Sequence, residues 1–507
     1  MAVTIYSAQV VGLNARPISV EVDIAPGLHV FTIVGLADKE VQEARERIAA
    51  AIKNLGALAP HKKSQRVIVN LAPADIKKEG PAFDLPIALG YLLASGQIVF
   101  SPKEKLFLGE LGLDGTLRRV SGVLPIAIAA RAAGFTTMIV PKTNGPEAAI
   151  LEGIDIIEAE DLFEVIEFLS EKKSLSPLPR RELPFHLPAA CPVDLKDIKG
   201  QEKAKRAIEI AAAGSHNALL SGPPGSGKTI LAQAITGILP PLSFEEAIET
   251  NKIYSIAGLL TDTQPFVTHR PFRNPHHTSS HAAIVGGGTY PKPGEITLAH
   301  RGVLFLDEFP EFDRRVIESL RQPLEERKVT ITRTQGTQTF PAQFMLIAAQ
   351  NPCPCGNFGN PVKDCICSPG SILKYKKKIS GPMLDRIDLH IDVPQVEYDT
   401  LEGREGESSD SVRRRVEQAR ALQKQRFMGL SITTNAEMGL REIKQFIRIN
   451  DSLRPTVKLA HERFRLSARA YHRVLKLTRT IADLANSEEI EEKHFTEALQ
   501  YRPKQET

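Results

Sequence analysis

Long apolar runs are missing from this chain of 507 residues. No uninterrupted apolar stretch reaches the roughly eighteen residues that a membrane-spanning helix requires, and the opening segment lacks the basic flank, apolar core and cleavage site of a secretory signal. An excess of one charge is missing too, because 64 lysines and arginines face 60 acidic residues. The net charge of +4 permits a nucleic-acid partner without establishing one. These absences exclude a membrane protein and predict a cytoplasmic one.

Cysteine is scarce, with five in the chain, and its distribution is uneven. Four cysteines form two Cys-x-Cys pairs within fifteen residues, whereas Cys191 stands alone in a proline-rich segment. In a reducing compartment such clustering points to metal binding rather than to disulfides. Four thiolates without an open water position would form one structural zinc site, with free thiols or an iron–sulfur cluster as alternatives. The four candidate ligands are Cys353, Cys355, Cys365 and Cys367.

The order of apolar patterns along the chain predicts an α/β protein of several modules. Residues 1–170 alternate β-branched runs with helical ones and predict a first α/β domain. Residues 171–194 are too rich in proline for regular structure and are typical of a linker. Residues 195–398 carry every phosphate-handling motif within a second α/β pattern, which predicts a parallel sheet. Charged amphipathic segments over 399–507 predict a small helical bundle.

A phosphate-binding loop is the strongest local signal. The segment NALLSGPPGSGKTILAQAI combines an apolar strand, a loop of glycine and proline, and a helix start. Loop N–H groups in this arrangement turn onto phosphates, Lys228 reaches the β and γ phosphates, and the Thr229 hydroxyl ligates magnesium. The predicted nucleotide-binding residues are Gly222, Pro223, Pro224, Gly225, Ser226, Gly227, Lys228, Thr229 and Ile230, with Asp307 downstream. The sequence therefore predicts a site for ATP and Mg²⁺.

Two further apolar strands end in polar side chains suited to ATP hydrolysis. The run GVLFL ends at Asp307 and Glu308. Asp307 would hold magnesium, directly or through water, and Glu308 would polarise the attacking water as general base. The run FMLIAAQ ends at Asn351, whose neutral side chain is suited to orienting the water or the γ-phosphate. Together with Lys228 these residues are the predicted hydrolytic set.

Four longer segments carry a family resemblance. They are FRNPHHTSSHAAIVGGGTYPKPGEITLAHRGVLFLDE, NPCPCG, KISGPMLDRIDLHI and LSARAYHRVLKLTRTIADL. Through them the chain resembles the magnesium-chelatase-like AAA+ family, in the group of bacterial ATPases that includes ComM and YifB. The resemblance implies a ring, usually a hexamer, with each ATP between neighbouring subunits. Arg386 then resembles the arginine finger that one subunit supplies to its neighbour's ATP, and Arg469 or, one turn later, Arg473 resembles the second sensor arginine.

Two insertions resemble those of the chelatase and replicative-helicase branch of AAA+ proteins. One, from about residue 253 to 300, is rich in glycine and histidine, and its His276 and His277 are expected to pack or hydrogen-bond within the loop rather than bind metal. The other, KVTITRTQGTQTFPAQFML, predicts a hairpin around Thr334–Thr337. Such hairpins in related ring motors point into the central pore, which would make Arg333 available to DNA phosphates. A hairpin that serves only packing or subunit contact is the alternative.

The first domain resembles the proteolytic domain of Lon proteases. The resemblance lies in KKEGPAFDLPIALGYLL and LRRVSGVLPIAIAARAAGFTTMIVPKTN. Ala82 stands where Lon carries its nucleophilic serine, and Leu124 stands where its catalytic lysine would be. Because neither half of the dyad is present, we expect a role in assembly or DNA binding rather than peptidase activity.

The combined expectation is an ATP-dependent DNA motor. The resemblance implies a hexameric helicase that drives branch migration of recombination intermediates during natural transformation, with single-stranded and branched DNA as partners. The lysine run 374–378 beside the cysteines is either a solvated face or a contact for phosphates or the adjacent subunit. The alternatives are a chelatase ATPase subunit that drives metal insertion into a tetrapyrrole, and a DNA-independent assembly factor. The Lon-like domain and the cysteine cluster favour the DNA motor.

Overall fold

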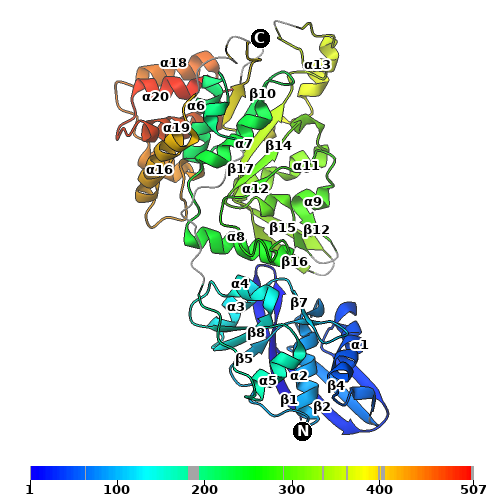
Figure 1. Cartoon of the computed structure of the whole chain (residues 1–507). Helices are drawn as coiled ribbons and strands as arrows, with labels where there is room; N and C mark the ends of the chain where they lie inside the picture. Colours follow the sequence, from blue (N-terminus) through cyan, green and yellow to red (C-terminus); the bar gives the residue numbers. More distant parts are fainter. Residues whose placement is uncertain are drawn as a thin grey trace. The chain divides into compact units, whose positions relative to one another are not determined.

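The structure is a computed structural model that describes residues 2–62, 64–180, 193–288, 291–333, 336–360, 363–397, 400 and 406–503, with only the backbone of Arg333 and Gly336. Contacts group the chain into two compact units. The first consists of Met1–Pro184 and Ala247–Val267, and the second of Phe185–Glu246 and Thr268–Thr507. Figure 1 labels many of the helices and strands of each unit.

The first unit is a mixed α/β domain. Its strands are β1 (Val3–Val11), β2 (Asn14–Pro26), β3 (Val30–Val34), β4 (Gln65–Ala72), β5 (Lys105–Phe107), β6 (Glu110–Leu111), β7 (Leu117–Arg118), β8 (Thr137–Pro141) and β9 (Asp155–Ala159). Its helices are α1 (Lys39–Asn54), α2 (Asp84–Ala94), α3 (Val123–Ala132), α4 (Gly145–Ala148) and α5 (Leu162–Leu169). The strands form a four-stranded sheet in the order β1-β2-β4-β3, a three-stranded sheet in the order β5-β8-β9, and the pair β6-β7.

Side-chain alternation and helix capping explain these elements. β4 buries every second residue, including Val67, Val69 and Leu71, as expected for a strand with one face on a core. α1 begins after Asp38, whose side chain accepts a hydrogen bond of 2.8 Å from the Val41 N–H. At the Lon-like lysine position, Leu124 is fully buried in α3, and its backbone N–H donates to the Glu147 carboxylate at 3.0 Å.

A segment that follows the phosphate-binding motif in sequence belongs to this first unit. It contains most of α8 (Phe244–Ala257) and continues to Val267. The Gly122 N–H donates to the Ser255 carbonyl at 3.1 Å, and the Ser255 hydroxyl donates to Glu147. Glu147 is 2% exposed, and its burial raises the pKa of the carboxyl group. Polar contacts therefore attach this segment to the unit.

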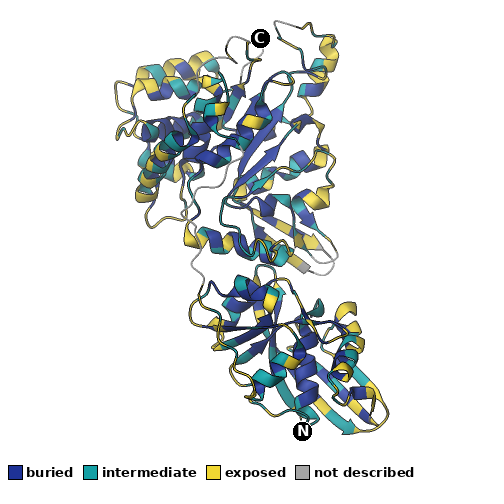
Figure 2. Cartoon of the chain, in the orientation of Figure 1, coloured by how far each residue is buried: buried dark blue, intermediate teal, exposed yellow. Residues whose placement is uncertain are grey.

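The second unit contains the predicted parallel sheet. Its strands are β10 (Ala218–Ser221), β11 (Phe272–Arg273), β12 (Gly286–Gly287), β13 (Lys292–Pro293), β14 (Val303–Leu306), β15 (Lys328–Arg333), β16 (Gly336–Pro341), β17 (Met345–Gln350) and β18 (Leu389–Asp392). Five of them form the sheet in the order β11-β14-β17-β10-β18, and every pairing is parallel. The prediction of a second α/β domain with a parallel sheet is confirmed. Figure 2 shows its central strands as buried, in agreement with their uninterrupted apolar runs.

Two antiparallel hairpins, β12-β13 and β15-β16, accompany this sheet. The second confirms the hairpin predicted from the alternating pattern, and its register pairs Arg333 with Gly336. Thr334 and Gln335, at its tip, lie outside the described residues. β15 buries Val329 and Ile331 and exposes Thr330 and Thr332, so one face of this strand packs and the other is polar.

Helices complete the second unit. They are α6 (Glu202–Gly214), α7 (Lys228–Ile238), α9 (His281–Val285), α10 (Glu295–Leu298), α11 (Arg314–Ser319), α12 (Arg321–Glu326), α13 (Pro369–Lys376), α14 (Gly381–Leu384), α16 (Ser409–Arg426), α17 (Leu440–Phe446), α18 (Arg454–Phe464), α19 (Ala468–Leu484) and α20 (Glu492–Gln500). α16 packs against α6 and α7, and α19 packs against α6 (Figure 1). The predicted C-terminal helical region is therefore confirmed. No helix in the part of the chain that the structure describes is long and apolar enough to span a bilayer.

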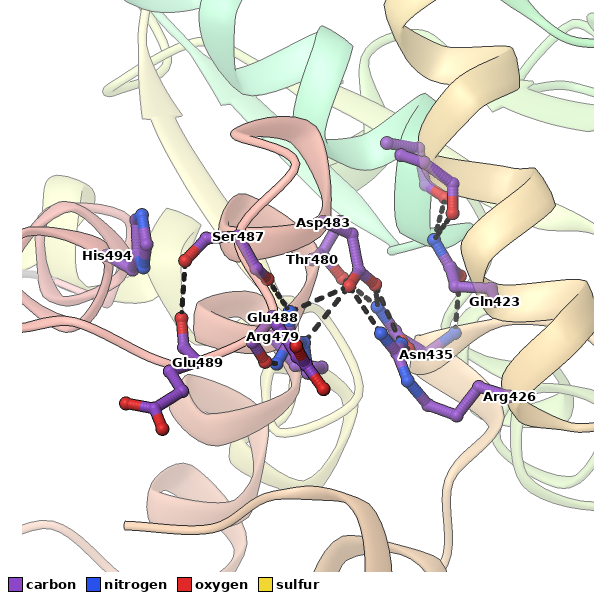
Figure 3. A network of polar contacts seen from close by, with 12 residues as sticks. Gln423, Arg426, Asn435, Arg479, Thr480, Asp483, Ser487, Glu488, Glu489 and His494 are labelled. Carbon is purple, nitrogen blue, oxygen red and sulfur yellow. Dashed lines mark hydrogen bonds and ion pairs between the residues drawn. The ribbon is translucent and has the colours of Figure 1, made fainter. Parts of the chain in front are cut away.

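A buried carboxylate holds the C-terminal helices together. Asp483 of α19 accepts hydrogen bonds from Arg426 of α16 at 2.8 Å and from Arg479 at 3.0 Å (Figure 3). His216, also fully buried, lies 2.8 Å from the Thr480 hydroxyl and 3.2 Å from Asp388. Because Asp388 directly precedes β18, this contact fixes the helical region against the edge of the parallel sheet.

Candidate functional site

The phosphate-binding loop connects β10 to α7, as its sequence predicts. Gly225 and Gly227 have φ angles of 74° and 90°, a region that favours glycine. A Cβ on Gly222 would lie 2.1 Å from the Val393 carbonyl oxygen, so only glycine fits there. The loop thus passes close to the end of β18 and then opens α7, whose first residue is Lys228. Free N–H groups at such a helix start suit an anionic phosphate.

Lys228 and the ends of β14 and β17 meet at this loop. The Lys228 ammonium donates to the carbonyls of Gly222 and Pro223 at 2.7 and 2.8 Å and to Asn351 Oδ1 at 3.2 Å. Burial lowers the pKa of Lys228, while the charges of Asp307 and Glu308 oppose that shift. The arrangement follows from topology, because parallel strands bring their carboxyl ends to one edge of the sheet.

Thr229 and Asp307 form a pair suited to a divalent cation. The Thr229 hydroxyl donates to Asp307 Oδ2 at 2.8 Å, and Asp307 Oδ1 accepts from the Glu308 N–H at 2.9 Å. A hydroxyl and a carboxylate oxygen are ligands that Mg²⁺ accepts beside phosphate oxygens. The residues present therefore fit Mg²⁺ bound together with a nucleotide.

Glu308 lies at a strained turn beyond this pair. Its φ of 51° is uncommon for a residue with a side chain and is often found at functional sites. Its side chain is 53% exposed, and its Oε2 lies 3.2 Å from His277 Nδ1. Sequence reasoning assigned His277 to packing or hydrogen bonding within its own loop. No sequence signal could have found this contact, because it depends on the pairing of β14 with β11, a strand of only two residues that His277 closely follows.

The four clustered cysteines converge in space. Their sulfur atoms all lie within 4.8 Å of one another, and Sγ of Cys353 lies 3.4 Å from that of Cys355 and 3.6 Å from that of Cys365. A disulfide would require about 2.05 Å, whereas four sulfurs at about 2.3 Å from a tetrahedral zinc are about 3.8 Å apart. The donor set is therefore compatible with zinc. Cys191 lies outside the described residues.

The cysteine loop lies against the phosphate-binding loop. A Cβ on Gly356 would be 2.5 Å from Pro224 Cδ, so the two loops are in close contact. In the following lysine run, Lys376 lies over the Phe358 ring at 5.1 Å and Lys378 pairs with Glu311 at 2.8 Å. Two of the lysines therefore have partners within the chain, while Lys374 and Lys377 are exposed.

The three candidate arginines line a separate pocket of about 510 Å³. Arg386 is 10% exposed and donates to Glu325 and to the Pro382 carbonyl. Arg473 donates to the Ile387 carbonyl at 2.6 Å and pairs with Asp385. The residues of this pocket that the structure describes include neither Lys228 nor Asp307. The structure thus brings Arg386, Arg469 and Arg473 together, but not with the phosphate-binding loop of the same chain.

Comparison with known proteins gives matches over nearly the whole chain. A family model described as "Magnesium chelatase, subunit ChlI" matches residues 194–401, "Subunit ChlI of Mg-chelatase" matches 20–144, and "Magnesium chelatase, subunit ChlI C-terminal" matches 406–502. Competence protein ComM of Haemophilus influenzae is 43% identical over 98% of this chain and 97% of its own length. YifB of Escherichia coli is 43% identical over 98% of this chain and 96% of its own length. Lon protease 2 of Bacillus subtilis is 30% identical over 32% of this chain and 33% of its own.

Proposed function

This chain belongs to the magnesium-chelatase-like AAA+ family of ATPases that includes ComM and YifB, and from that premise we propose that it is a ring-forming motor that remodels DNA. The observation that carries the proposal is the match to a protein named for competence along 98% of the chain, rather than over the ATPase region alone. The substrates would be single-stranded and branched DNA, and the task branch migration of recombination intermediates in natural transformation. The protein would act as a hexamer in the cytoplasm.

The geometry of the phosphate-binding site supports the proposed hydrolytic roles. Lys228 can exchange its bonds to the loop carbonyls for bonds to the β and γ phosphates. Thr229 and Asp307 would hold Mg²⁺, and Asn351, 3.2 Å from the lysine, would orient the γ-phosphate or the water. Glu308 would take the proton of the attacking water. Gly222–Ile230 would surround the triphosphate.

The arginine pocket supports a ring. An arginine finger must reach the γ-phosphate of an ATP, and Arg386 lies in a pocket that lacks the phosphate-binding residues of its own chain. The ATP it would serve is therefore a neighbour's. Arg473 donates to backbone carbonyls and pairs with a carboxylate in the loop that carries Arg386. We therefore assign Arg473 a structural role in positioning that loop. Arg469 is the better candidate for a second sensor, and it too would act on the neighbouring subunit.

Two alternatives to the DNA motor are a chelatase ATPase subunit and a DNA-independent assembly factor. All three family models carry the chelatase description, and one of them covers residues 20–144, so the Lon-like domain does not separate a DNA motor from a chelatase subunit as its sequence suggested. A DNA-independent assembly factor is the other candidate. ATPase turnover measured with and without single-stranded, duplex and branched DNA distinguishes them, because only the DNA motor is expected to be stimulated.

DNA binding by the proposed motor should weaken steeply with salt. Each neutralised duplex phosphate releases a counterion and lowers the logarithm of affinity by roughly 0.9 per logarithmic unit of salt. Arg333, at the end of β15, is the proposed phosphate contact. Arg333→Ala should therefore reduce the salt dependence of the affinity by the contribution of about one phosphate. It should also impair the remodelling of branched DNA more than basal ATPase turnover. Fluorescence anisotropy over a salt series and a strand-exchange assay measure the two effects.

Arg333→Lys is the matched control, because it retains the charge and should retain most of the slope. ATP-hydrolysing rings that neither bind branched DNA at low salt nor remodel it would overturn the proposed function. Equal losses of remodelling and basal turnover in Arg333→Ala would contradict only the proposed DNA contact of the hairpin β15-β16.

We also propose that the four clustered cysteines hold one structural zinc. Protein purified without chelator should contain about one zinc per chain by elemental analysis. Cys365→Ser should lose the metal and lower the melting temperature, because the loop that the zinc would close packs on Pro224 through Gly356. Cys191→Ser is the control and should keep the full metal content. Less than about half a zinc per chain in the wild type contradicts this assignment.

A further inference from the structure

A strongly basic segment of the C-terminal helices has no role in the proposed mechanism. It comprises residues 440–466, which include α17 and α18. Seven lysines and arginines face three acids there, so this segment alone carries the net charge of +4 that the whole chain has. Such a concentration of positive charge is typical of a surface that binds a polyanion. The seven basic residues, all exposed, are Arg441, Lys444, Arg448, Arg454, Lys458, Arg463 and Arg465.

Little of this charge is neutralised within the chain. Arg454 lies 3.3 Å from Asp451 and Lys458 lies 4.0 Å from Glu462, but both pairs are mostly exposed, and such pairs are weak. The other five basic residues form no ion pair with any residue that the structure describes. α16 provides the contrast, because four of its five arginines form ion pairs with acids of the same chain. The positive charge of residues 440–466 is therefore available to a ligand.

Part of the charge lies along a groove of about 630 Å³ beside α18. Arg454, Lys458 and His461 line it, and their spacing of four and three residues places them on one face of the helix over about 10 Å. The groove therefore combines a row of basic side chains with apolar walls and an aromatic ring. Its lining residues are Ile449, Arg454, Val457, Lys458, His461, Glu462 and Tyr471.

Tyr471 lies on a face of α19 that the proposed ATPase mechanism does not use. Side chains two residues apart on a helix point about 200° away from each other. Accordingly, Arg469 lines the arginine pocket whereas Tyr471 lines the groove. Tyr471 also packs against the buried core, which holds its ring in place. A fixed aromatic ring beside a row of cations is typical of single-strand binding, because an unpaired base can stack on it.

We propose that this groove binds a single strand of DNA, with Arg454 and Lys458 on its phosphates and a base stacked on Tyr471. The contact is separate from the hairpin β15-β16, which lies elsewhere in the second unit (Figure 1). The choice of DNA rests on the proposed function, whereas the preference for a single-stranded polyanion rests on the residues of the groove. An acidic peptide matches the charge but offers no base to stack. Sequence preference should be slight, because every base has an aromatic face.

Arg454→Ala combined with Lys458→Ala tests the phosphate contacts in the full chain. Fluorescence anisotropy of a labelled oligothymidylate, measured over a salt series, should lose about 1.4 units of slope, because each single-strand phosphate contributes about 0.7. The loss of affinity should therefore grow by about 25-fold from 1 M to 0.1 M salt. Lys203→Ala combined with Lys424→Ala is the matched control. It removes two exposed charges from α6 and α16 of the same unit and should leave slope and affinity unchanged.

Tyr471→Leu tests the stacked base. It should weaken binding of the same oligonucleotide by about five- to a hundredfold, the range of one base stacked on an aromatic ring. The salt slope should stay unchanged, because no charge is removed. Tyr471→Phe keeps the ring and should bind like the wild type. Duplex DNA of the same length has no unpaired base, so Tyr471→Leu should bind it as the wild type does.

The outcomes separate the groove from the proposed function. A wild type that binds branched DNA but not the oligonucleotide, or a double variant with the wild-type slope, overturns the groove alone. A wild type that at low salt binds neither DNA also overturns the proposed function. A double variant that loses its assembly by light scattering but keeps its DNA affinity makes the surface a subunit contact and overturns the proposal. Equal weakening of duplex and single-strand binding in a folded Tyr471→Leu overturns the stacked base, and if that variant misfolds, the slope of the double variant decides.

Discussion

Glu308→Gln should bind ATP as tightly as the wild type and hydrolyse it at least about a hundredfold more slowly, since general-base catalysis contributes about 10² or more. The amide is nearly isosteric with the carboxylate, so the turn at φ 51° and the nucleotide site should persist. Lys228→Ala should instead lose nucleotide binding, because it removes the ammonium buried among the loop carbonyls where the phosphates would lie. Binding of a fluorescent ATP analogue and phosphate release, measured on both variants, separate the two roles.

Glu311→Gln provides the matched control for this pair. Glu311 is an exposed acid three residues further along, paired with Lys378 rather than placed at the phosphate-binding loop. It should therefore bind and hydrolyse ATP like the wild type. Normal turnover in Glu308→Gln would defeat its assignment as the general base, and normal ATP affinity in Lys228→Ala would defeat the assignment of the phosphate clamp.

The sequence predicted the phosphate-binding site because each part of it is a local pattern. An apolar strand, a glycine loop and a helix start are contiguous from Asn217 to Ile235, and the acids Asp307 and Glu308 directly end a buried strand. Parallel topology then brings these local motifs to one edge of the sheet without further information. The hairpin β15-β16 was predictable for the same reason, since its alternation is local.

Contacts between segments distant in sequence could not be predicted in this way. β11 has two residues, too few to show any periodicity, so nothing indicated that the loop after it would reach Glu308. The attachment of residues 247–267 to the first unit was equally hidden. Its buried side chains include Thr250, Asn251 and Ser255, and such polar residues produce no apolar pattern. The pocket shared by Arg386 and Arg469 likewise depends on how the C-terminal helices pack, which no motif encodes.

Arg386→Ala should leave ATP binding largely intact and reduce turnover by about a thousandfold, the lower end of the effect of an arginine finger. Binding should survive because the Arg386 pocket does not include the phosphate-binding residues of its own chain. Turnover should fall because the transition-state charge on the neighbour's γ-phosphate loses its guanidinium. Arg386→Lys should recover little, since lysine cannot reproduce the planar, two-point contact. Phosphate release and nucleotide binding by the purified protein measure these effects.

Mixed rings test whether Arg386 acts on the neighbouring subunit. An Arg386→Ala subunit retains its phosphate-binding loop, and a Lys228→Ala subunit retains its arginine, so equal mixing should rebuild about a quarter of the sites. Mixing Lys228→Ala with Glu308→Gln is the control, because Glu308 lies on the same chain's nucleotide site as Lys228. In a ring of those two variants, each nucleotide site would lack either Lys228 or Glu308, so no active site should be rebuilt. Co-purification through two different tags establishes that mixed rings form, and no recovery in such rings of Arg386→Ala with Lys228→Ala would place the action of Arg386 within its own chain.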